Sequence, residues 1–122
     1  MRLDTAPQNG GPVVRAFGPA GFLVDERRFS ALLMTTTDVF AWTPPPLAGL
    51  AEADLAPLLD PAPEFILLGT GEALARPPRA LVAALEARNI GLDPMDSRAA
   101  ARAWAVLRAE SRSVAMALYP LP

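Results

Sequence analysis

The sequence predicts an α/β fold with a mixed sheet. We expect a three-layer β/β/α-type single domain in which an antiparallel N-terminal meander precedes a β-α-β-α-β series. Three observations predict it. Short strand-like runs separated by turn residues fill residues 13–42. A continuous apolar run at residues 64–68 leads into two glycines, and residues 98–110 show helical periodicity. We expect the helices mainly on one side of the sheet.

Length and composition suit one domain. The chain has 122 residues, of which 52% are hydrophobic and 20% charged, so it holds enough apolar side chains for a core. Residues 5–12 are polar and rich in Gly and Pro. We therefore expect a flexible N-terminal arm over residues 1–12 and a single α/β domain over residues 13–122.

The first half is expected to form the antiparallel meander. Its predicted strands are residues 13–17, 21–24, 29–36 and 39–42. The charged residues 25–28 are placed at a hairpin tip between the second and third strands. Three consecutive prolines, Pro44 to Pro46, end the sheet, because proline cannot donate a ladder hydrogen bond.

The second half alternates between helices and strands. Leu55, Leu58 and Leu59 share one face of a short helix expected at residues 51–59. The apolar strand at residues 64–68 is typical of strands that are buried on both faces. The remaining helices are expected at residues 79–88 and 98–110, and the remaining strands at residues 90–94 and 113–118.

The last helix and the last strand each have two faces that differ in their side chains. The helix has one apolar face, formed by Ala100, Ala103, Trp104 and Leu107. The strand places Val114, Met116 and Leu118 on one side and the small residues Ala115 and Ala117 on the other. The alanine side predicts close packing of a helix against the strand.

Composition removes several classes of function. The net charge is −2 and the pI is about 5.0, so we expect no nucleic-acid partner. The chain lacks Cys and His, and all 11 basic residues are arginines. These absences exclude disulfides, thiolate catalysis, zinc sites, His-based triads and a lysine nucleophile. Acid–base chemistry would fall to Asp, Glu or Tyr119.

We therefore expect no catalytic residue, no cofactor and no metal site. The N-terminus has no long apolar stretch after its first charge, which argues against a signal peptide. The apolar runs are shorter than the roughly 20 residues that span a bilayer, so we expect no membrane span and a cytoplasmic location.

The first candidate binding feature is Gly69-Thr70-Gly71, which follows the buried strand. Two glycines allow a sharp bend and a close approach of the backbone to a ligand. The carboxyl ends of buried strands are also where open α/β sheets place ligands. A structural turn is the favoured interpretation and a binding loop is the alternative, because the segment lacks a complete phosphate motif.

A second candidate lies at the start of the last helix. Asp93, Asp96 and Ser97 stand beside the unsatisfied amides of its first turn. An N-cap by Asp96 or Ser97 is the favoured interpretation. The alternative is a polar or anionic ligand bound by these amides, Ser97 and Arg102.

A third group of residues is a candidate for interface or structural roles. Arg102 belongs to an arginine stripe that is typical of a solvated helix face. Glu110 and Arg112 lie on either side of the helix end, where each can link two chain segments through a bidentate ion pair. Trp42 and Trp104 are expected in the core or at the rim of a groove, and either can anchor an interface.

The chain resembles a known family in residues spread over nearly its whole length. The resemblance rests on Pro63–Gly71, Gly91–Arg102, Leu107, Glu110, Arg112 and Val114–Leu118, together with Phe17, Gly18 and Trp42. This order is similar to the family that contains mitochondrial respiratory complex I assembly factor 3 and uncharacterised archaeal and bacterial single-domain proteins. The family usually has Glu where Asp93 stands and often has Asn where Ala105 stands.

The resemblance implies a three-layer β/β/α-type domain without established enzymatic activity. We therefore expect a non-enzymatic binding or assembly protein that acts through protein contacts or a groove near Gly69–Gly71. One alternative is an enzyme or sensor that binds a small anionic ligand there with carboxylates and arginines. Another is a homo-oligomeric scaffold. The sequence leaves the oligomeric state open.

Overall fold

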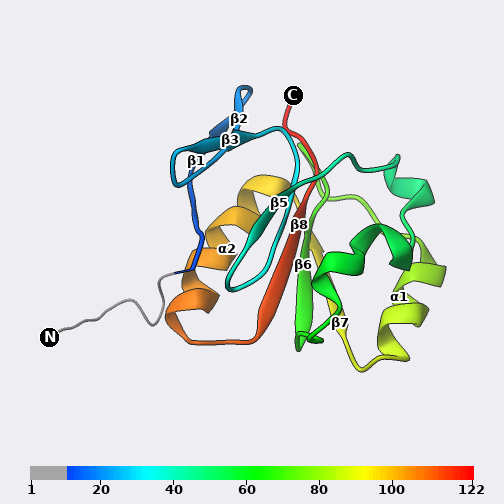
Figure 1. Cartoon of the computed structure of the whole chain (residues 1–122). Helices are drawn as coiled ribbons and strands as arrows, with labels where there is room; N and C mark the ends of the chain where they lie inside the picture. Colours follow the sequence, from blue (N-terminus) through cyan, green and yellow to red (C-terminus); the bar gives the residue numbers. More distant parts are fainter. Residues whose placement is uncertain (1–10) are drawn as a thin grey trace, which may run out of the picture.

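A computed structural model describes residues 11–122 and shows two sheets (Figure 1). The smaller sheet is an antiparallel meander of β1 (Val14–Gly18), β2 (Gly21–Val24) and β3 (Arg27–Phe29). The larger sheet has the strand order β5-β4-β8-β6-β7. These two sheets and their helices confirm the predicted mixed α/β fold. Residues 1–10 of the expected arm lie outside the described residues.

The predicted strand at residues 29–36 is wrong as a single element. The structure divides this region between β3 and β4 (Leu32–Met34), which belong to different sheets. Phe22 pairs with Phe29 in the small sheet, whereas Met34 pairs with Met116 in the large one. The sequence does not reveal where one strand ends and the next begins, because the apolar side chains before and after this point are all buried.

The large sheet combines antiparallel and parallel pairs. Strand β4 pairs antiparallel with β5 (Val39–Ala41) and with β8 (Val114–Leu118). Strand β6 (Phe65–Gly69) pairs in parallel with both β7 (Gly91–Met95) and β8. The three parallel strands therefore share a carboxyl end, where Gly69 lies beside Met95 and Leu118, and an opposite amino end.

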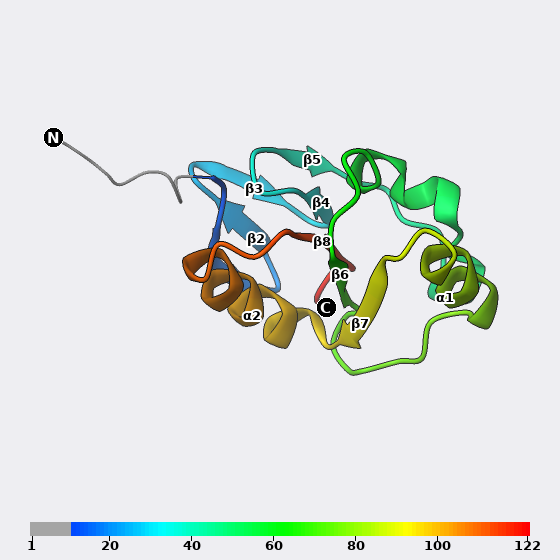
Figure 2. The same cartoon turned by 90° about the horizontal axis from the view of Figure 1, so that it is seen from below.

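The helices cover both faces of the large sheet, so the expectation of helices mainly on one side is wrong. Figure 2 shows α2 (Ser97–Ala109) and α1 (Arg79–Glu86) on opposite faces. The 3₁₀ helices η2 (Leu47–Gly49) and η3 (Glu52–Leu58) precede β6. From β6 the chain crosses to β7 on one side, then returns past β6 to β8. Right-handed connections in opposite directions put their helices on opposite faces.

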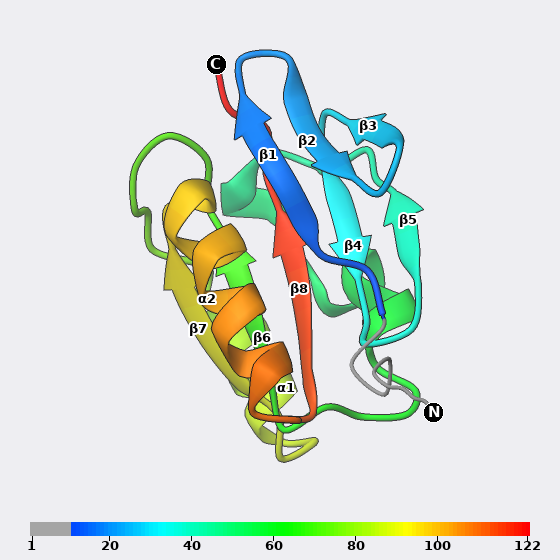
Figure 3. The ribbon, with the colours of Figure 1, turned by 90° about the vertical axis from the view of Figure 1, so that its left-hand side faces the viewer.

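Two hydrophobic clusters fill the space on either side of the large sheet. One contains Ala115 and Ala117 with side chains of η3 and α1. The other contains Met116 and Leu118 with α2 and the small sheet, and Figure 3 shows β1 beside α2 in front of the large sheet. The predicted alternation along the last strand is confirmed. Trp104 is fully buried, and its indole nitrogen donates a hydrogen bond to the Pro12 carbonyl over 2.9 Å.

Candidate functional site

The carboxyl end of the parallel strands is closed by hydrogen bonds between three chain segments. The fully buried Ser97 hydroxyl accepts a hydrogen bond from the Gly71 amide over 2.9 Å and donates one to the Tyr119 carbonyl over 2.8 Å. The Ser97 amide donates to the Gly71 carbonyl, and the Tyr119 amide donates to the Gly69 carbonyl. These groups satisfy one another, so the Gly71 amide already has its acceptor.

Both glycines are required by the geometry of this closure. A methyl group on Gly69 would lie 2.6 Å from Cδ2 of Leu118 and 2.9 Å from the Ser97 Cα. Gly71 has a φ of +102°, a left-handed conformation that favours glycine. Gly69 therefore allows the start of α2 to approach β6 closely, and Gly71 turns the chain away from it.

Thr70 organises the loop that follows. Its amide donates to the Met95 carbonyl over 2.8 Å, which fixes the loop to β7. Its hydroxyl donates to the Ala73 carbonyl over 2.7 Å and accepts from the Ala75 amide over 3.0 Å. Between these two bonds stands Leu74, whose side chain is 65% exposed. The loop thus presents a large apolar side chain to solvent in a fixed conformation.

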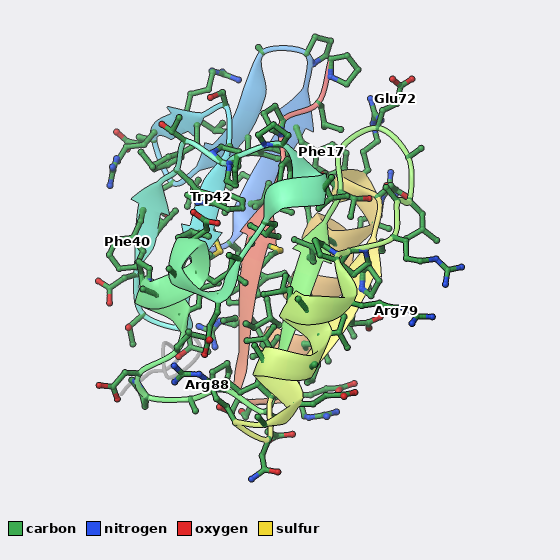
Figure 4. The ribbon with its side chains drawn as sticks, turned by 90° about the vertical axis from the view of Figure 1, so that its right-hand side faces the viewer. Phe17, Phe40, Trp42, Glu72, Arg79 and Arg88 are labelled. Carbon is green, nitrogen blue, oxygen red and sulfur yellow. The ribbon has the colours of Figure 1, made fainter. Side chains whose placement is uncertain are left out.

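Two shallow hollows adjoin this loop. The first, of about 430 Å³, is lined by Leu74, Ala75, Arg76, Pro77 and Pro94. The second, of about 300 Å³, shares Arg76, Pro77 and Pro94 and continues over α1 past Arg79 to Glu86. Figure 4 shows Glu72 and Arg79 extending outward from this side of the molecule. Within residues 11–122, neither Arg76 nor Arg79 forms an ion pair.

Of the residues predicted to form the second candidate site, only Ser97 is hydrogen-bonded to the Gly69–Gly71 turn. Asp96 is the N-cap of α2, and its carboxylate accepts from the Ala99 amide over 2.9 Å. Asp93 is exposed on the edge strand β7, and Arg102 is exposed with its guanidinium 5.3 Å from the Phe17 ring centre. Between described residues, no hydrogen bond or ion pair joins Asp93 or Arg102 to Ser97.

The interface candidates lie elsewhere. At the amino end of the sheet, an Arg112 Nη lies 3.4 Å from a Glu64 carboxylate oxygen and the other lies 3.9 Å from one of Glu110. Trp42 meets the Tyr119 ring edge-on, with 5.2 Å between the ring centres. Trp104 is buried and so is unavailable for surface contact.

Tyr119 links the closed end to the proline segment. Its hydroxyl donates to the Pro45 carbonyl over 2.8 Å. Burial, followed by the nearby Asp54 carboxylate, raises the pKa of Tyr119 to about 12. The phenol therefore stays protonated at neutral pH and serves as a hydrogen-bond donor.

Sequence reasoning missed Leu74 and Arg108. Leu74 is an isolated apolar residue in an otherwise loop-like segment, which is a weak signal. Arg108 stands four residues after Trp104, on the apolar face of α2, and is only 7% exposed. That spacing was the available signal for a buried arginine.

Comparison with known proteins shows extensive similarity to proteins of undescribed function. Residues 14–119 match the family described as protein of unknown function (DUF498/DUF598). A crystal structure of a Bordetella parapertussis protein is 32% identical and has a TM-score of 0.83, with 93% of this chain and 99% of that chain covered. An uncharacterized protein from Rhodobacter capsulatus is 39% identical over 59 residues, 48% of this chain and 48% of that protein.

The description of one further similar structure refers to a cellular location. It is described as an outer membrane protein from Bartonella henselae, with 26% identity, a TM-score of 0.82, and coverage of 93% of this chain and 98% of that chain. Within residues 11–122, no helix has the length and apolar character that crossing a membrane requires.

Proposed function

Because this chain belongs to the DUF498/DUF598 family, whose function is unknown, we propose from its own surface that it is a non-enzymatic binding module. The proposed site is the loop after Gly71 together with the two hollows beside it. Its ligand is a segment of another protein that covers Leu74. We further propose that the module acts in the cytoplasm as an assembly factor, in the manner of the complex I assembly factor that it resembles.

The observation that carries the proposal is the fixed, exposed position of Leu74. Its 65% exposure is the largest among the large apolar side chains of the described residues. The bonds of Thr70 to Ala73 and Ala75 hold the loop before a partner arrives. Less conformational entropy is then lost on binding, which supports a role as a preformed contact. Pro77 and Pro94 line the hollow that the partner's own apolar side chain would enter.

The test compares two exposed apolar residues. Tagged wild-type protein would be used to capture partners from its own host, in parallel with the variants Leu74→Asp and Val106→Asp. Val106 is 59% exposed on α2 and lines neither hollow, so it is a matched control. Burying a leucine contributes about 1.5–3 kcal/mol, so Leu74→Asp should weaken capture of the specific partner roughly tenfold or more. Equal capture by both variants would refute this site.

The alternative at the same surface is an enzyme or sensor for a small anion. The observation that favours it is the absence of a described acidic partner for Arg76 and Arg79. Under this alternative, Arg79→Gln would abolish phosphate-induced changes in the loop, whereas Leu74→Asp would preserve them. Amide NMR spectra of the two variants with added phosphate separate the two proposals.

A further inference from the structure

The amino end of the parallel strands contains a buried arginine without a hydrogen-bond acceptor. Arg108 lies in the last turn of α2 and is 7% exposed. No described residue accepts a hydrogen bond from its guanidinium, and its Nε is buried without a partner. The carbonyl end of the helix favours a positive charge there, but only by about 0.3–1 kcal/mol. Burying an unpaired charge costs far more, and no residue in the range 11–122 supplies a counter-charge for this cation.

A hollow of about 360 Å³ lies beside Arg108. It is lined by two arginines and four hydroxyl side chains: Arg108, Arg112, Thr36, Thr37, Ser111 and Ser113. Guanidinium groups and hydroxyls are donors that match the oxygens of phosphate and carboxylate groups. The lining therefore has the chemistry of an oxyanion site.

The acidic groups near this hollow leave Arg108 available. Glu64 and Glu110 both lie near Arg112 and are exposed. Asp38 accepts a hydrogen bond from the Thr37 hydroxyl over 2.7 Å and is also exposed. None of these three carboxylates pairs with Arg108. Among residues 11–122, Arg112 is thus partly neutralised and Arg108 has no carboxylate partner.

A second hollow, of about 290 Å³, continues from the first and shares Thr36, Thr37 and Ser113 with it. Most of its lining is apolar, including Leu58, Val114 and Phe40, whose side chain is 38% exposed. Figure 4 shows Phe40 extending outward from β5. Asp38 and Asp60 also line this hollow and would repel an anion from it. An anionic group is therefore directed to the Arg108 side and an apolar group to the Phe40 side.

We propose that these joined hollows, the amino-end cleft, bind a small organic oxyanion. Its phosphate or carboxylate group contacts Arg108 and Arg112, and its apolar body packs against Phe40, Pro57 and Pro61, the exposed apolar residues of the lining. The site lies at the opposite end of the parallel strands from the Leu74 surface, so it stands or falls independently of the protein-binding proposal. An inorganic anion and an organic anion with an apolar group would make the same contacts with the two guanidinium groups. The two kinds of ligand would differ only in the contact with the apolar part of the cleft.

The experiment uses inorganic phosphate and phenyl phosphate as probes at constant ionic strength. Binding is followed by ¹⁵N NMR, through the side-chain Nε–H signal of Arg108 and the amides of Thr36 and Ser113. We expect saturable shifts of these signals with both probes and about tenfold tighter binding of phenyl phosphate, because its ring buries apolar surface. Shifts that do not saturate, or that occur equally over the whole surface, would overturn the proposal.

Three variants separate the parts of the cleft. Arg112→Gln should weaken both probes roughly tenfold, as expected for loss of a charge-assisted contact. Phe40→Ser should leave phosphate binding unchanged and remove the preference for phenyl phosphate. Arg28→Gln removes an equal charge from an exposed position on β3 and should change neither affinity. If Arg28→Gln and Arg112→Gln weaken binding alike, the anion is responding to overall charge and the assignment fails.

Discussion

The two ends of the parallel strands differ in how their polar groups are satisfied. At the carboxyl end, the Gly71 amide, the Ser97 hydroxyl and the Tyr119 carbonyl bond to one another. At the amino end, Arg108 is buried and has no described acceptor. Open α/β sheets usually bind ligands at the carboxyl end. Here that end is closed by hydrogen bonds within the chain. The buried arginine without a described acceptor lies at the other end.

Glycines near a strand end can serve close packing as well as ligand approach. Gly69 has no room for a methyl group because Ser97 and Leu118 occupy it. A ligand is more directly indicated where a buried donor lacks an acceptor, since leaving such a group unpaired is costly.

The largest effect is expected for Gly69→Ala at the closed end. The added methyl group would meet the Ser97 Cα at 2.9 Å, and a backbone atom cannot move aside as a side chain can. We expect a loss of about 3 kcal/mol in the free energy of unfolding, measured by urea denaturation. Gly18→Ala is the control, because its methyl group would have no atom within 4 Å. Equal stability of the two variants would show that the structure around residue 69 can accommodate an added methyl group.

Ser97→Ala should have the next largest effect. It removes the hydroxyl that accepts from Gly71 and donates to Tyr119, and leaves two buried backbone groups unpaired. We expect a loss of about 2 kcal/mol in chemical denaturation. Faster hydrogen exchange of the Gly71 amide should accompany it. An unchanged exchange rate would mean that this amide does not depend on Ser97 for protection.

Tyr119→Phe should cost about 1 kcal/mol, because it removes the hydrogen bond to the Pro45 carbonyl. The chain has a single tyrosine, so phenolate absorbance reports on this residue alone. The folded pKa of about 12 exceeds the ordinary value of 10.0. The folded state thus keeps the proton that the unfolded state loses, and wild-type stability should fall as pH rises from 10 towards 12.

The variant Tyr119→Phe should lose the part of this alkaline slope that comes from residue 119. Stability measured by denaturation at several alkaline pH values provides the check. A wild-type phenol that titrates near pH 10 would contradict the burial of Tyr119.

The smallest stability effect is expected at the amino end. Ser113→Ala changes an exposed side chain with no described hydrogen bond, so the free energy of unfolding should change by less than about 0.5 kcal/mol. Its effect should appear instead as weaker phosphate binding in the NMR titration. A large stability loss without any change in binding would reverse the contrast between the two ends.

Several elements of the fold were predictable from local patterns. The strand at residues 21–24 matches β2, and the helix at residues 98–110 matches α2 within one residue. Residues 29–36 were misread because strand propensity does not report which sheet a strand joins. The prediction of helices mainly on one side failed because the face of each crossover depends on strand order, which local patterns do not contain.

The candidate sites were predictable only in part. The residues of the Gly69–Gly71 turn were identifiable, and the turn conformation needs Gly71 for its φ of +102°. Their partner Ser97 is 26 residues away from Gly71, and no local rule pairs them. Arg108 was equally hidden, since arginine on a helix is usually exposed and its burial depends on packing around α2.

The sequence by itself determined the strand and helix segments, the glycine turn, and the absence of Cys, His and Lys, because these depend on neighbouring residues and composition. The tertiary structure alone decided that the carboxyl end is closed and that Arg108 is buried beside a hollow. The reason is physical: hydrogen bonds such as that of Ser97 to Tyr119, 22 residues apart, form only when packing brings distant segments together. Where packing leaves a buried donor without a protein acceptor, a water, an ion or a ligand must take that role.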